Sequence, residues 1–244
     1  QHLYDFVDSI ICHSDHIEAR LKSEFSVPMA KISVIPHGPF FYDLPDVGSE
    51  SILRNFGLDQ GKMMVLWQGI IFPYKGIDLL LRAWQRVEAA EGAALLVIAG
   101  TGSPELLEQI RAQVAELGLK QVKMCFRFIS TEELVALDRA ADVVVYPYRA
   151  ITTSGALATG LALDKAIVAS DLAVFRELLT NGENALLVDP ENTAELAGAL
   201  VKLLDDPALR ERFSAKVREM DFGDRSWLSI AEKTVAVYES VLSR

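Results

Sequence analysis

The stretch "PYRAITTSG" (147–155) combines one cation, several hydroxyl groups and a glycine, and it contains no acid. Ser154 and Gly155 open a helix-like run of small residues, and the free amides at a helix N-terminus bind anions. Arg149 lies just upstream of them. The stretch therefore predicts a site for a negatively charged ligand. The alternative is a helix cap supplied by Thr153 or Ser154, with Arg149 as an ordinary surface residue.

A second cation, Lys75, stands in "QGIIFPYKG" (68–76), where Gly69 ends an apolar run. Glycine lets a ligand approach the backbone closely. A lysine at the start of a helix opposes the positive end of the helix dipole, and an anion beside it would relieve that cost. The pattern is consistent with phosphate binding and equally with a solvated lysine paired with Asp78.

Strand-like and helix-like segments alternate along the chain, which is typical of a parallel sheet covered on both faces. The strand-like segments are 8–14, 31–38, 63–69, 94–100, 122–128, 142–148, 166–170 and 185–189. The helix-like segments are 15–25, 52–56, one beginning near 76, 104–117, 130–141, 154–163, 175–179, 192–206, 207–220 and 227–242.

From about Met63 to Asp189, about six strands form one doubly wound, Rossmann-like unit. Ligands of such sheets sit at the carboxyl ends of the strands, which selects the loops that contain Lys75 and Arg149. The loop "AGTGS" (99–103) is not G-x-G-x-x-G, so it is interpreted as a tight turn.

Composition excludes several functions. The net charge of −10 disfavours a nucleic-acid surface. Cys12 and Cys125 lie in apolar strand-like runs, so buried reduced thiols are expected rather than a disulfide. The four histidines crowd the first 37 residues without the spacing of a zinc site, and no metal is expected. No apolar run approaches the ~20 residues of a membrane span. No signal peptide is visible at the start. The start also lacks a methionine, so a fragment or a processed chain is expected.

Five segments, in this order, carry a family resemblance: "ISVIPHGPF", "VLWQGIIFPYKGIDLLLRAW", "LLVIAGTG", "FISTEELVALDRAADVVVYPY" and "KAIVASDLAVFRELLTNGENALLVDPENTAELAGAL". Together, from about Val34 to Leu204, they resemble the C-terminal, nucleotide-sugar-binding half of GT-B glycosyltransferases of family four, the glycosyl transferases group 1. The implied fold is a Rossmann-like, doubly wound parallel α/β sheet, the C-terminal half of the GT-B fold.

The resemblance implies individual roles. The donor diphosphate would be held by Lys75, Gly69, Ser154 and Gly155. The donor sugar or ribose would be held by Thr153, Thr159 and Arg149, and the nucleobase by Arg127 and Ile129. Relatives carry two glutamates, as E-x7-E, where this chain has Ile151 and Thr159, and an arginine where it has Ile70. The chain instead resembles a branch with P-Y-R-x-x-T-x-S-G, in which hydroxyls and amides take over the donor contacts.

The resemblance also implies three parts: 1–38 as a remnant of the N-terminal acceptor domain and hinge, 39–226 as the donor-binding domain, and 227–244 as a crossover C-terminal helix. "PFFYDLPDVGSE" (39–50) is interpreted as a linker. The partners would be a nucleotide sugar, a glycan or lipid-linked acceptor and a missing N-terminal Rossmann domain that supplies the catalytic base.

The implied reaction moves a sugar from a nucleoside-diphosphate sugar to that acceptor, with retention and without a cofactor or metal. Polysaccharide biosynthesis in the cytoplasm, with peripheral contact at the inner membrane face, is the family-level expectation. A non-catalytic nucleotide-sugar-binding module is the alternative, because the glutamates and the arginine are replaced. A different GT-B enzyme, such as a sugar-nucleotide epimerase or phosphorylase, fits the order of the segments less well.

Overall fold

The computed structural model describes residues 2–38, 49–58, 61–90, 94–220 and 227–243. They fall into two compact units. The larger unit comprises 41–151 and 155–220, and the smaller unit comprises 1–40, 152–154 and 221–244. The expected linker 39–50 lies almost entirely outside the described residues, and the predicted domain boundaries stay predictions.

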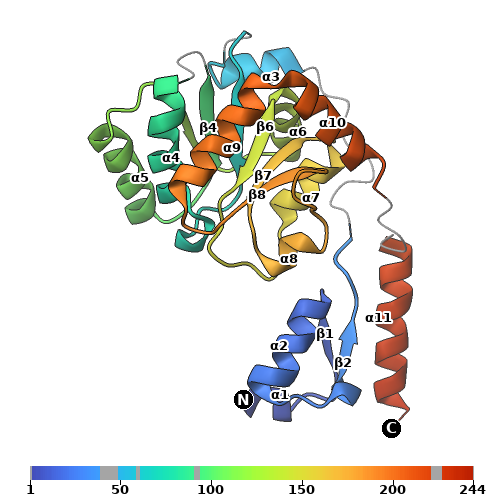
Figure 1. Cartoon of the computed structure of the whole chain (residues 1–244). Coiled ribbons are helices and arrows are strands. Elements are labelled where there is room, and N and C mark those ends of the chain that lie inside the picture. The colour runs from blue at the N-terminus through green and yellow to red at the C-terminus, as the bar shows by residue number, and fades with distance from the viewer. Residues whose placement is uncertain (1, 39–48, 59–60, 91–93, 221–226, 244) are drawn as a thin grey trace. The chain divides into compact units, whose positions relative to one another are not determined.

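The larger unit is built on a parallel sheet of six strands in the order β5-β4-β3-β6-β7-β8 (Figure 1). Its strands are β3 (Met64–Gln68), β4 (Leu95–Gly100), β5 (Val122–Phe126), β6 (Val143–Tyr146), β7 (Ala166–Ser170) and β8 (Ala185–Val188). The central strands are buried on both faces, as continuous apolar runs require in a parallel sheet. The predicted Rossmann-like α/β class is confirmed.

Helices precede, connect and follow the strands and cover both faces of this sheet (Figure 1). They are α3 (Ser49–Asn55), α4 (Ile77–Ala90), α5 (Pro104–Glu116), α6 (Thr131–Ala140), α7 (Gly155–Ala162), α8 (Ala173–Arg176), α9 (Thr193–Asp205) and α10 (Pro207–Arg218). A 3-10 turn, η2 (Pro73–Lys75), precedes α4.

The main core lies on one face of the sheet, where Val65 and Trp67 of β3 pack with residues of α4, α5, α9 and α10. The predicted apolar face of α4 is part of it. Successive strand residues point to opposite faces. On the other face, Gly160 of α7 lies against Val144 and Tyr146, so the sheet is covered on both sides.

The smaller unit pairs β1 (Ile10–Cys12) with β2 (Ile32–Val34) in parallel, joined by α2 (Asp15–Phe25) and the 3-10 turn η1 (Met29–Lys31). It also holds α1 (His2–Asp5), which the sequence did not predict, and α11 (Trp227–Leu242). Cys12, Leu21 and Val27 form its small core.

Both cysteines are free thiols, and Cys12 is buried as predicted. The expectation of burial is wrong for Cys125, which is only half-buried because β5 is an edge strand whose residues all keep part of their surface exposed. No helix among the described residues has the length and apolar character that crossing a membrane requires.

Candidate functional site

The order of the strands places a crevice between β3 and β6. From β3 the chain moves outward through β4 and β5, and from β6 it moves the other way through β7 and β8. The loops after these two neighbouring strands therefore leave in opposite directions, and ligands of open parallel sheets bind at such a switch point. Lys75 follows β3, and Tyr148 and Arg149 follow β6.

Glycines bring these loops into close contact. Gly76 has a left-handed backbone, φ 68°, and a Cβ there would overlap the Pro147 carbonyl oxygen beyond β6. Gly100, at the end of β4, has φ 151°, and a Cβ there would overlap the carbonyl oxygen of Gly69. Any larger side chain at either position would push the strand ends apart, so the compact crevice depends on glycine.

Lys75 is a half-buried cation at this switch point. Its Nζ lies 5.7 Å from the ring centroid of Trp67 and 5.6 Å from that of Tyr148. A Cβ placed on Gly69 would stand 3.0 Å from the same Nζ. Within the part of the chain that the structure describes, no carboxylate forms an ion pair with Lys75. Burial lowers the pKa of Lys75, since removal from water disfavours the charged form.

Asp78 pairs with Arg149, so the alternative in which Asp78 neutralises Lys75 is wrong. The Arg149 guanidinium donates to both carboxylate oxygens of Asp78, at 2.8 and 2.7 Å. Burial raises the pKa of Asp78, but the hydrogen bonds and charge of Arg149 outweigh it, and the pKa falls below its usual value.

Arg149 also fixes the segment that carries Lys75. Its guanidinium donates to the Pro73 carbonyl at 3.0 Å, and its backbone amide donates to the Tyr74 carbonyl at 2.7 Å. A further contact reaches Glu191 at 3.1 Å. Four of the five N–H groups of the guanidinium thus donate to protein groups, which gives Arg149 a positioning role for η2.

Arg127 and Ile129, which were expected to hold the nucleobase, both line a small pocket at the carboxyl ends of β3, β4 and β5. Its volume is about 130 Å³. It is lined by Gln68, Gly69, Ile70, Ala99, Gly100, Thr101, Arg127, Phe128, Ile129 and Leu134. Gly69 therefore adjoins both Lys75 and this pocket. The structure brings together Gly69, Lys75, Arg127 and Ile129 among the predicted site residues.

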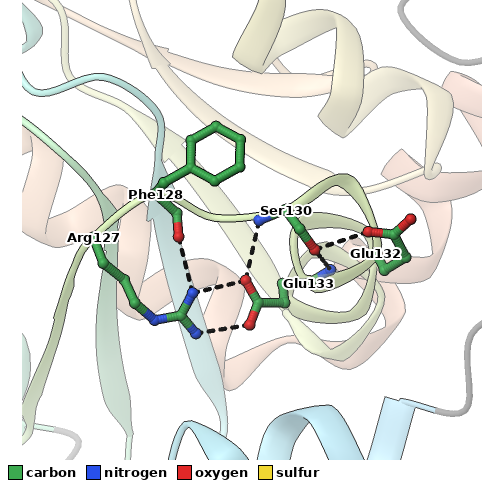
Figure 2. A network of polar contacts seen from close by, with 5 residues as sticks. All are labelled: Arg127, Phe128, Ser130, Glu132 and Glu133. Atoms are coloured by element: carbon green, nitrogen blue, oxygen red, sulfur yellow. Dashed lines mark hydrogen bonds and ion pairs between the residues drawn. The ribbon is translucent and has the colours of Figure 1, made fainter.

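The Arg127 guanidinium is turned toward the N-terminus of α6 rather than into open space. Figure 2 shows its two hydrogen bonds to Glu133, both 2.7 Å, and one to the Phe128 carbonyl at 2.9 Å. Glu133 also accepts from the Ser130 amide, while the Ser130 hydroxyl accepts from the Glu133 amide, which confirms the predicted capping box. The helix end is thereby satisfied by the protein itself.

The remaining predicted residues cluster at α7. Thr159 is only 2% exposed, and its hydroxyl donates to the Gly155 carbonyl at 3.1 Å, one turn earlier in the helix. That hydroxyl is therefore occupied within α7. Thr153 and Ser154 come directly before Gly155, the first residue of α7, but residues 152–154 group with the smaller unit. Their roles at a donor, like those of Gly155 and Thr159, stay predictions.

Sequence reasoning missed three side chains around these loops. Trp67 and Tyr148 form the aromatic walls beside Lys75, and Gln68 lines the pocket with Arg127. Gln68 had a readable signal, because a polar residue at the end of a buried strand is unusual unless it faces a ligand or a partner. The aromatic residues carried none, since strand ends often bear such side chains for packing alone.

Known protein sequences match this chain over most of its length. The family of glycosyl transferases group 1 matches residues 49–220. An uncharacterised glycosyltransferase of Methanocaldococcus jannaschii is 27% identical over 94% of this chain and 59% of its own length. A phosphatidyl-myo-inositol mannosyltransferase of Mycobacterium leprae is 34% identical over 69% of this chain and 44% of its own.

Solved structures share the fold. The HepE protein of Anabaena, in complex with UDP and glucose, superposes with a TM-score of 0.78 at 18% identity, over 99% of this chain and 64% of that one. Crystal structures named as glycosyltransferases match as well, which identifies the architecture as GT-B. The chain spans between 41% and 60% of the length of the first curated relatives it matches.

The sequence match covers the whole six-stranded unit, from α3 to the end of α10, and therefore includes the crevice between β3 and β6 with its half-buried lysine. This chain belongs to the glycosyl transferases group 1 family.

Proposed function

We propose that this chain is the donor-binding half of a glycosyltransferase that moves a sugar from a nucleoside-diphosphate sugar to a glycan or lipid-linked acceptor. The observation that carries the proposal is Lys75, a half-buried ammonium group without a carboxylate partner among the described residues, set at the switch point of the sheet. An unpaired cation removed from water is costly unless an anion completes its site. The diphosphate of the donor is such an anion.

In the proposed reaction, the bond between the anomeric carbon and the β-phosphate oxygen breaks, and the acceptor oxygen forms a new bond to that carbon as its proton is lost. The nucleoside diphosphate leaves with the bonding electrons. Lys75 stabilises this developing charge, and Gly69 lets the diphosphate approach the backbone at the end of β3. The outcome is retention at the anomeric carbon, without a metal or cofactor, and the catalytic base comes from a second Rossmann domain.

Several further assignments belong to this proposal. Amides and hydroxyls of Thr153, Ser154 and Gly155 contact the diphosphate and sugar, in place of the glutamates of relatives. The larger unit is the donor domain, while residues 1–38 and 227–244 belong to the acceptor side. One relative is named a phosphatidyl-myo-inositol mannosyltransferase, which supports a lipid-linked acceptor. Polysaccharide or lipid-linked glycan synthesis at the cytoplasmic membrane face belongs to the same proposal.

Calorimetric titration of the chain with UDP, GDP and ADP tests donor binding. We expect at least one diphosphate to bind, and Lys75→Met to weaken it by about 1.5–3 kcal/mol, the range of a charge-assisted hydrogen bond. The matched control is Lys120→Met, because Lys120 is exposed at the end of the sheet away from the crevice. Unchanged affinity in Lys75→Met would remove Lys75 from the site.

A non-catalytic nucleotide-sugar-binding module is the second candidate, and Ile70 favours it. Ile70 lines the pocket and is 57% exposed, at the position where the family resemblance implies an arginine, so no side-chain cation stands at that position. Sugar transfer by the longer protein that contains this chain separates the two candidates. Turnover that Lys75→Met abolishes supports the enzyme, whereas binding of a sugar nucleotide without any turnover supports the module.

A further inference from the structure

Gln68 is the last residue of β3, and it supplies the one amide side chain among the described residues that line the pocket with Arg127 and Ile129. It is 3% exposed, which is rare for glutamine. Trp67, before it, points into the core on the α4 face, and alternation along the strand turns Gln68 to the other face, under Leu134 of α6.

The Gln68 side chain carries an unused hydrogen-bond donor. Among the residues that the structure describes, none accepts a hydrogen bond from its Nε2 atom, and that atom is shielded from solvent. A buried amide without a partner destabilises a fold by about 1–3 kcal/mol, so such groups are rare in the absence of a ligand that completes them. Because Gln68 lines the pocket, an acceptor atom of a ligand bound there would complete this donor.

The other residues that line the pocket indicate which kind of chemical group carries that acceptor atom. Ile70, Ile129 and Leu134 are apolar, and Phe128 is 78% exposed at the rim. The Arg127 guanidinium forms an ion pair with Glu133, so the cation of the pocket is already paired (Figure 2). The same guanidinium lies 4.7 Å from the Phe56 ring centroid. An uncharged, flat group with one hydrogen-bond acceptor fits these walls, whereas a phosphate does not.

The volume and position of the pocket indicate that it holds only one end of a larger ligand. Its volume of about 130 Å³ is below the ~300–1,000 Å³ of pockets that enclose whole ligands. Gly69, the residue after Gln68, adjoins Lys75, so a ligand with its diphosphate at Lys75 would reach the pocket with its nucleobase.

We propose that Gln68 selects the nucleobase of the donor, its Nε2 group donating to a ring carbonyl oxygen of uracil or guanine. This inference rests on the proposed function, because it requires a nucleoside diphosphate at Lys75. Uracil and guanine present an exocyclic carbonyl oxygen, whereas adenine presents an amino group at the corresponding place. Gln68 thereby sets which class of sugar nucleotide the site accepts.

The test is a calorimetric comparison of UDP, GDP and ADP on the wild-type chain and on Gln68→Met, which keeps the length of the side chain and removes the donor. Wild type should bind UDP or GDP more tightly than ADP. Gln68→Met should weaken the preferred diphosphate about three- to tenfold, the range of one neutral hydrogen bond, and leave ADP within twofold. The control is Gln109→Met, an exposed glutamine of α5 that lies outside this pocket.

Gln68→Glu, which replaces the donor by an acceptor of the same shape, serves if Gln68→Met does not fold, and it should also weaken the preferred diphosphate selectively. Equal weakening of all three diphosphates, no weakening, or a wild-type preference for ADP overturns the role of Gln68. In those cases binding that still depends on Lys75 leaves the proposed function standing. No binding of any diphosphate overturns both.

Discussion

The Arg149 guanidinium donates two hydrogen bonds to the Asp78 carboxylate, at 2.8 and 2.7 Å. This pair joins the loop after β6 to the first turn of α4. The same guanidinium donates to the Pro73 carbonyl in the turn that carries Lys75. Two loops that are far apart in the sequence are thereby held as one unit. The cation that we propose for the diphosphate owes its position to this pair.

Asp78→Asn should therefore weaken diphosphate binding without removing any proposed contact. The side chains of Arg149 and Asp78 are 30% and 41% exposed. The expected loss in free energy of unfolding is therefore only about 0.5–1 kcal/mol. Calorimetry should show a several-fold loss of affinity, smaller than that of Lys75→Met. The matched control is Asp164→Asn, which breaks the exposed pair with Arg218 before β7. An affinity that responds equally to both variants would contradict the positioning role.

Gly76→Ala should destabilise the chain far more than a left-handed backbone alone explains. Gly118 has nearly the same φ, 67°, with nothing near the position of a Cβ, whereas a Cβ on Gly76 overlaps the Pro147 carbonyl. We expect about 1–2 kcal/mol for Gly118→Ala and about 3 kcal/mol or more for Gly76→Ala, measured by chemical denaturation. Similar losses in the two variants would show that the close approach of the loops is dispensable.

The affinity for a diphosphate should fall at a lower pH than it would if the lysine in the site were exposed. Burial lowers the pKa of Lys75 from its ordinary value of 10.5, so the empty site loses its charge at a lower pH. The bound anion requires the ammonium form, and proton uptake on binding then reduces affinity as the pH approaches 10. Calorimetry between pH 7 and 10 measures this effect. Lys75→Met should remove the decline, and a decline that persists in this variant would assign it to another group.

Asp138 should make the chain less stable as the pH rises from about 4 to 7. This carboxyl, in α6, is fully buried, and no hydrogen-bond partner reaches its oxygens among the described residues. Burial raises its pKa from 3.8 to about 7, against the charge of Lys165. The folded state thus holds a proton that the unfolded state has lost, and the free energy of unfolding decreases over this interval.

Asp138→Asn should remove that pH dependence, because the amide does not titrate. Thermal melts at pH 5 and pH 8 measure the free energy of unfolding of the variant minus that of wild type. This difference should be more favourable to the variant at pH 8 than at pH 5, by on the order of 2–4 kcal/mol. The control is Glu211→Gln, an exposed carboxyl of α10. A difference between variant and wild type that is the same at both pH values would count against a buried titrating carboxyl.

Much of the fold was readable from short-range patterns. The continuous apolar runs at Met64–Gln68 and Val143–Tyr146 indicated strands buried on both faces, and Ser130 with Glu133 indicated the start of α6. These signals are local, because burial and capping act within a few residues of each other. The turns at Met29–Lys31 and Pro73–Lys75 were not predicted, since a single 3-10 turn leaves no periodicity to read.

The sequence by itself determined the alternation of strands and helices, the family and the loops that belong to the carboxyl edge of the sheet, including Gly69 and Lys75. It could not determine which partner each charged side chain takes. Asp78 lies close to Lys75 in sequence yet pairs with Arg149, because strand order makes the loops after β3 and β6 neighbours. The unused amide of Gln68 is likewise a tertiary property, since burial and the absence of an acceptor depend on residues contributed by β3, β4, α6 and the loops after three strands.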